Sequence, residues 1–110
     1  MSRKNVRKFH NVPTIINGEK FDSKGEAARW QELKYMEMAG EIVELTRQVK
    51  YDMMVNDVKV CSFIPDFEYV KDGELITEDF KSSATMTATF RLKAKLFKAL
   101  YGRDVIISKK

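Results

Sequence analysis

Three short segments of this 110-residue chain place acidic side chains and one lysine where they could share a divalent metal ion. The segments are residues 23–26 (Ser-Lys-Gly-Glu), 64–67 (Ile-Pro-Asp-Phe) and 78–81 (Glu-Asp-Phe-Lys). Asp79 and Lys81 are two residues apart, so both side chains leave the same face of an extended strand. A carboxylate that binds metal would then lie beside an ammonium that can hold an attacking water. This combination suits the hydrolysis of phosphodiesters.

Asp66 follows Pro65 at the end of a strand that we expect over residues 58–67. Proline lacks the amide proton of a ladder hydrogen bond, so strand pairing should weaken there and leave room for an ion. A hairpin around Asp72 would bring Asp66 beside Asp79. Two carboxylates this close repel each other unless a cation or protons intervene, and hard oxygen ligands suit Mg²⁺ or Mn²⁺. Alternatively, the Pro-Asp pair only begins a turn.

The strand that carries Asp79 offers two further groups. Lys81 would contact the nucleophilic water and the scissile phosphate, offsetting charge in the transition state. In the alternative interpretation it is an ordinary strand-end lysine paired with Glu68 or Glu78. The ring of Phe80 should point to the opposite face and into the core, while its backbone carbonyl could complete a metal shell. By the same alternation Glu78 faces away from Lys81, so Asp79 is the preferred ligand.

Two roles are possible for Glu26, a helix cap and a contributor to the metal site. Ser23-x-x-Glu26 matches a capping box, in which the glutamate bonds back to the amide of the cap residue at a helix start. A glutamate in the first helical turn can also project toward an adjacent sheet. There it could bind a second metal ion or hold a water on the first.

The chain has 20 Lys and Arg residues against 16 Asp and Glu, a net charge of +4 and a pI of about 9.2. This balance suits a polyanionic partner. The candidate DNA-binding residues are Arg3, Lys4, Arg7, Lys8, Lys24, Arg91, Lys93, Lys95 and Lys98. The alternative is that these charges form a solvated tail and the wet face of a helix.

Some classes of protein are excluded by composition. The one cysteine, Cys61, rules out an internal disulfide, and the one histidine, His10, rules out a zinc cluster or a histidine-centred triad. No apolar run approaches the roughly 20 residues that span a bilayer, and no signal-peptide core follows the basic N-terminus. We expect a cytoplasmic protein without a membrane partner.

We divide the chain into a basic arm, residues 1–13, and a single domain, residues 14–110. The expected elements are a hairpin around Asn17-Gly18, a helix from Ser23 to about Ala39, strands over 49–55, 58–67 and 74–80, a loop over 82–89, a helix that ends at Gly102 and a strand over 104–108. Helix, three-stranded meander, helix and strand predict an α/β (α+β) fold with a mixed sheet and helices packed on it.

With these motifs in this order, the chain resembles the PD-(D/E)XK nuclease superfamily, and more narrowly the small phage-encoded endonucleases related to Holliday-junction resolvases. The resemblance covers about residues 14–108 and includes residues 21–27, 64–67, 78–81 and 91–102. It implies a restriction-endonuclease-like core, a Mg²⁺ cofactor that Mn²⁺ can replace, and catalytic roles for Glu26, Asp66, Asp79 and Lys81. One departure is Ser82-Ser83, where related sequences often have glycine straight after the lysine.

The function expected from this resemblance is Mg²⁺-dependent endonucleolytic cleavage of DNA, selective for branched structures. Asp66, Asp79 and the Phe80 carbonyl would hold the metal, with Glu26 as a further contributor. One site per chain predicts a homodimer for cutting both strands of a junction. The alternatives are a non-catalytic DNA-binding accessory protein that keeps the fold, and a mismatch or nicking endonuclease. A ribonuclease or RNA-binding module is less well supported, because the aromatic residues fall in apolar core positions.

Overall fold

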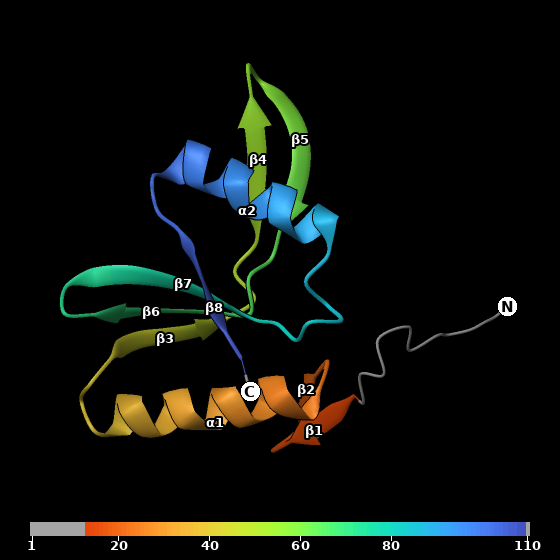
Figure 1. Ribbon diagram of the computed structural model, residues 1–110. Coiled ribbons are helices and arrows are strands. Elements are labelled where there is room, and N and C mark those ends of the chain that lie inside the picture. Colours follow the sequence, from red (N-terminus) through yellow and green to blue (C-terminus); the bar gives the residue numbers. More distant parts are fainter. Residues whose placement is uncertain (1–12, 110) are drawn as a thin grey trace, which may run out of the picture.

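The computed structural model describes residues 13–109 and shows two helices and eight short strands (Figure 1). In chain order these are β1 (Thr14–Ile16), β2 (Glu19–Phe21), α1 (Lys24–Met38), β3 (Val43–Arg47), β4 (Tyr51–Val55), β5 (Val58–Phe63), β6 (Phe67–Lys71), β7 (Glu74–Phe80), α2 (Ala88–Tyr101) and β8 (Val105–Ser108). The predicted basic arm, with Arg3, Lys4, Arg7 and Lys8, lies outside the described residues apart from its last position.

The centre of the molecule is a four-stranded mixed sheet in the order β3-β6-β7-β8. The first three strands pair antiparallel, whereas β8 runs parallel to β7. Parallel neighbours need a long crossover, and α2 provides it. Figure 1 shows α1 on one face of this sheet and α2 on the other, with the β4–β5 hairpin beside α2. The fold is therefore α+β with a mixed sheet between two helices, as the sequence predicts.

Local sequence signals explain both helices. The Ser23 hydroxyl accepts the amide of Glu26 at the start of α1, and the Thr87 hydroxyl accepts the amide of Phe90 at the start of α2. At the other end of α2, Gly102 adopts the left-handed conformation that stops a helix. The predicted helix boundaries at Ser23, Ala39 and Gly102 are confirmed.

The strand predictions need three corrections. The continuous strand expected over 58–67 is two strands, because β5 pairs with β4 in a separate sheet while β6 enters the central sheet. Pro65, which lacks an amide proton, lies in the break between them. Asp66 therefore precedes a strand instead of ending one, and the three-stranded meander is wrong. Finally, β3 was not predicted as a strand of its own.

The buried side chains form two cores, one on each face of the central sheet. Between α1 and the sheet, Trp30 stacks on Phe67 with ring centroids 5.9 Å apart, and Leu33 is fully buried. Between α2 and the β4–β5 hairpin, Phe97 packs edge-on against Phe63 at 5.6 Å. These two cores fix the ends of β6 and β7 relative to both helices. Neither α1 nor α2, the helices of the described part, is long and apolar enough to cross a membrane.

Candidate active site

The two aspartates predicted as metal ligands lie directly beyond the end of the β6–β7 ladder, where β7 still pairs with β8. The β6–β7 ladder stops at Phe67 and Glu78. Beyond it, the amide of Asp66 donates to Asp79 Oδ1 at 2.9 Å, and the amide of Phe80 donates to Asp66 Oδ2 at 2.9 Å. Asp79 thus accepts from the main-chain amide of Asp66 itself, and Asp66 accepts from the amide of the residue after Asp79. The strand ends hold the two acids together, as the spacing and the hairpin predict.

Lys81 shares the face of Asp79. Its ammonium lies 2.7 Å from Asp79 Oδ2 and 4.4 Å from the centroid of the Phe90 ring. The alternative partners Glu68 and Glu78 are not used. The Phe90 ring of α2 thus makes a cation–π contact with the Lys81 ammonium. This contact holds the ammonium near Asp79, although 17% of the Lys81 side chain is exposed.

Phe80 lies between Asp79 and Lys81 and points to the opposite face, where it packs against the first core as predicted. Its ring lies against Gly25 in the first turn of α1. A Cβ atom built on Gly25 would come within 2.3 Å of the Phe80 ring, which is far inside van der Waals contact. The absence of a side chain at Gly25 therefore lets α1 approach the end of β7.

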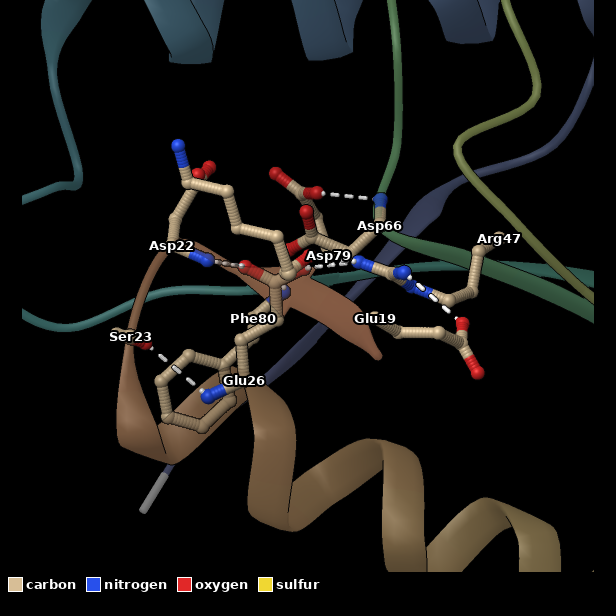
Figure 2. A network of polar contacts seen from close by, with 9 residues as sticks. Glu19, Asp22, Ser23, Glu26, Arg47, Asp66, Asp79 and Phe80 are labelled. Carbon is tan, nitrogen blue, oxygen red and sulfur yellow. Dashed lines mark hydrogen bonds and ion pairs between the residues drawn. The ribbon is translucent and has the colours of Figure 1, made fainter. Parts of the chain in front are cut away.

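Glu26 projects from the first turn of α1 toward this strand end (Figure 2). Its amide donates to the Ser23 hydroxyl at 3.1 Å, but its carboxylate accepts from the amide of Asp22 at 3.3 Å, one residue earlier than a capping box requires. The other oxygen, Oε2, is buried without a hydrogen-bond partner and lies 3.7 Å from the Arg47 guanidinium. The cap accounts for one carboxylate oxygen and leaves the second for another role.

A cavity of about 130 Å³ lies beside these groups. It is lined by Asp22, Ser23, Glu26, Asp66, Phe80, Lys81, Ser82 and Thr85. The three segments singled out in the sequence therefore border one cavity: they are the start of α1, the Pro-Asp segment and the end of β7.

The carboxylates of this site resist simultaneous ionisation. Burial, reinforced by the charges of Asp79 and Glu26, raises the pKa of Asp66 to about 9. Burial also raises the pKa of Glu26, with a further contribution from the charge of Asp22. Lys81 and Arg47 pair with Asp79 and Glu26, and Asp66 is the carboxylate of the three that has no cation of its own among the described residues.

A divalent cation fits this arrangement. All the donors are hard oxygens, and the buried Glu26 Oε2 lacks the partner that a buried carboxylate oxygen normally has. Within residues 13–109, no three acidic, histidine or cysteine side chains already surround one point as ligands of a metal. Mg²⁺ is commonly held by only one or two carboxylates and keeps several waters, so Asp66 and Asp79 would suffice as its side-chain ligands.

Glu78, the neighbour of Asp79, belongs to a different network on the α1 face of the sheet. Arg29 Nε donates to its Oε2 at 2.6 Å, and the Tyr69 hydroxyl donates to its Oε1 at 2.6 Å. Burial alone would raise the pKa of Glu78, but these hydrogen bonds hold it below its usual range. Glu78 is therefore a structural acid, and Asp79 is the strand carboxylate linked to Asp66, which lines the acidic cavity.

The predicted DNA-binding residues of the described part lie at different distances from the site. Lys93 lines a second cavity together with Asp79 and Lys81. Lys24 is exposed at the start of α1 and borders a cavity on the other side of Phe80. On α2, Arg91, Lys95 and Lys98 are exposed, and Lys98 pairs with Asp104 at 3.1 Å.

Arg47 is the main site residue that the sequence prediction missed. It reaches from β3 to Glu26 and pairs with Glu19 at 3.1 Å (Figure 2). It also donates to the Lys20 carbonyl at 2.9 Å and lies 3.9 Å from the centroid of the Phe21 ring. Strand β3 has no clear alternation, so nothing marked Arg47 in advance. Asp22 and Thr85, which line the cavity, were also missed. Only the position of Asp22 just before the Ser23 cap could have indicated it.

The fold and the site together define a small α+β protein with a lysine and a cluster of buried carboxylates where two strands end. The family described as "Protein of unknown function (DUF1064)" matches residues 6–109, and the chain belongs to this family. No curated protein and no solved structure matches the chain.

Proposed function

We propose that this protein is a Mg²⁺-dependent endodeoxyribonuclease with a PD-(D/E)XK-type core. The observation that carries the proposal is the link between Asp66 and Asp79 where the β6–β7 ladder ends, with the Lys81 ammonium 2.7 Å from Asp79. This arrangement combines two hard anionic ligands with one cation on a single strand edge. A purely structural ion pair would not need a second, half-buried aspartate beside it.

In this proposal Asp66, Asp79 and the Phe80 carbonyl would hold Mg²⁺, which as a Lewis acid would stabilise negative charge on the phosphate. Hydrolysis requires a water oxygen to attack phosphorus while one P–O ester bond breaks. The attacking water loses a proton, and the leaving ester oxygen takes one up. The Lys81 ammonium orients the water and offsets charge on the non-bridging oxygens. Glu26 Oε2, which has no hydrogen-bond partner, accepts a hydrogen bond from the same water.

We favour branched DNA as the substrate. Because such DNA arises inside cells, we also propose an intracellular location. Residues 13–109 contain one such site, so cutting both strands of a junction would take two copies, and we propose a homodimer. The basic residues Lys93, Arg91 and Lys95 would contact phosphates, which gives affinity that falls steeply with salt and carries little sequence information.

Asp79→Asn tests the proposal. Asparagine keeps an oxygen that can accept the Asp66 amide, so the strand ends stay linked while the charge is lost. We expect wild-type protein to cleave a four-way junction, a flap or a linear duplex with Mg²⁺ or Mn²⁺, and Asp79→Asn to be slower by about a hundredfold or more. DNA binding, measured by fluorescence anisotropy, should remain. Asp52→Asn is the control, because Asp52 is an exposed aspartate of β4 paired with Lys59.

Full activity of Asp79→Asn would refute the assignment of the site. Absence of cleavage of every DNA form with either metal, together with salt-sensitive binding, would favour a non-catalytic DNA-binding accessory protein. We retain this second candidate because, in the described part of the chain, no three side chains converge as ligands of a metal. Cleavage of mismatched duplex in preference to junctions would instead indicate a mismatch or nicking endonuclease.

A further inference from the structure

A second cavity adjoins the acidic site on the α2 side of the sheet. Its volume is about 270 Å³, and it lies between the end of β5, the end of β7 and the start of α2. Lys81 and Thr85 line both this cavity and the acidic one. The two cavities are therefore neighbours that share these two residues as lining.

The lining of this cavity has two chemically different parts. Phe63, Ile64 and Phe90 provide an apolar surface, and Ile64 is 50% exposed at this position. The polar part is provided by Lys93, by Asp79 in its ion pair with Lys81, and by three threonines, Thr85, Thr87 and Thr89. An apolar surface beside a cation and hydroxyl groups matches a nucleotide, whose sugar and base are partly apolar and whose phosphate is anionic.

The polar groups differ in what they can still bind. The Thr87 hydroxyl accepts the amide of Phe90 at 3.1 Å, so its own proton remains for donation. Lys93 forms no ion pair with any residue in 13–109, whereas Lys81 pairs with Asp79 and Lys98 pairs with Asp104. Lys93 is thus a cation without a counter-charge at the edge of a cavity that already contains the proposed catalytic lysine.

We propose that this cavity binds the nucleotide next to the scissile phosphate, with Lys93 and the Thr87 hydroxyl on its phosphate and Phe63 and Ile64 against its sugar and base. The inference rests on the proposed function, since the catalytic centre defines which phosphate is cleaved. Lys93 then contacts substrate one nucleotide away from the reacting atoms. Its loss should weaken substrate binding much more than the chemical step.

The experiment uses the full chain and thymidine 3′,5′-bisphosphate as the binding probe, measured by isothermal titration calorimetry without metal. Lys93→Gln should weaken binding of the bisphosphate about tenfold or more, because a charge-assisted contact to phosphate is lost. Lys93→Arg should restore most of it. Lys71→Gln, at the β6–β7 turn, is the charge-matched control and should bind as wild type does. For DNA, Lys93→Gln should raise KM with kcat nearly unchanged and reduce the salt dependence of binding by about one phosphate contact.

Equal binding of the bisphosphate by wild type and Lys93→Gln would overturn the subsite. If Lys93→Gln also cleaved DNA with wild-type KM, the nuclease proposal would stand without it. If wild type cleaved no DNA but bound the bisphosphate through Lys93, the nucleotide subsite would stand and the nuclease proposal would fail. An equal loss of binding in Lys71→Gln would also overturn the subsite, because the effect would then be one of net charge.

Discussion

Gly25→Ala tests the packing that joins α1 to the end of β7. The new Cβ would lie 2.3 Å from Phe80 Cζ and 2.6 Å from Cε2. Carbon atoms in favourable contact are about 3.5–4.0 Å apart, so the ring must move by roughly 1 Å or more. Overpacking of this kind costs about 1–3 kcal/mol, against which alanine gains up to about 1 kcal/mol of helix propensity. We expect a net loss of about 1–2 kcal/mol in the free energy of unfolding.

Urea unfolding followed by the fluorescence of Trp30 measures this loss. The matched test is the double variant Gly25→Ala with Phe80→Leu, which removes the ring atoms that the new Cβ would meet. The double variant should lose less free energy of unfolding than the two single variants lose together, because the two changes compensate each other. The Phe80 ring borders the acidic cavity, so a displaced ring should also slow any metal-dependent cleavage. Unchanged or higher stability of Gly25→Ala alone would refute the reasoning.

Two further predictions concern buried charges. Between about pH 3.8 and about pH 9 the folded protein keeps a proton on Asp66 that the unfolded chain releases, so the stability of the metal-free protein should fall as pH rises through this window. Asp66→Asn should flatten that slope in urea unfolding at several pH values, and an unchanged slope would contradict it. Arg103→Met should cost about 2 kcal/mol, because it removes the cation 3.4 Å from the buried Glu68 carboxylate. A loss below about 0.5 kcal/mol in thermal unfolding would show that the Tyr51 and Thr77 hydroxyls satisfy Glu68 without it.

Local chemistry was enough to predict the parts of the molecule that depend on near neighbours. Ser23 and Gly102 mark helix ends because a cap hydroxyl and a left-handed glycine act within a few residues. The shared face of Asp79 and Lys81 follows from strand alternation alone. The opposition of Asp66 and Asp79 required one further step, the hairpin around Asp72, where the chain does turn with a positive φ of 52°.

Long-range packing decided the parts that the sequence did not predict. Residues 58–67 are largely apolar whichever sheet they join, so the change of sheet at Pro65 left no separate signal. Strand β3 carries a register irregularity and a positive φ of 56° at Glu44, which breaks the alternation that would have marked it. Arg47 was therefore missed, and the dual environment of Glu26 could not be inferred from its capping position.

The separation of the β4–β5 hairpin from the central sheet has a consequence for how this family could diversify. The hairpin has its own two-stranded ladder, and its tip, Asn56 and Asp57, is an exposed turn with φ values of 50° and 64°. Exposed turns tolerate insertions better than paired strands do. Extra residues at this tip would lengthen the hairpin without shifting Asp66, whose position depends on β6 and β7. The hairpin tip is thus a position where natural or engineered insertions can add new surface while the acidic cavity stays unchanged.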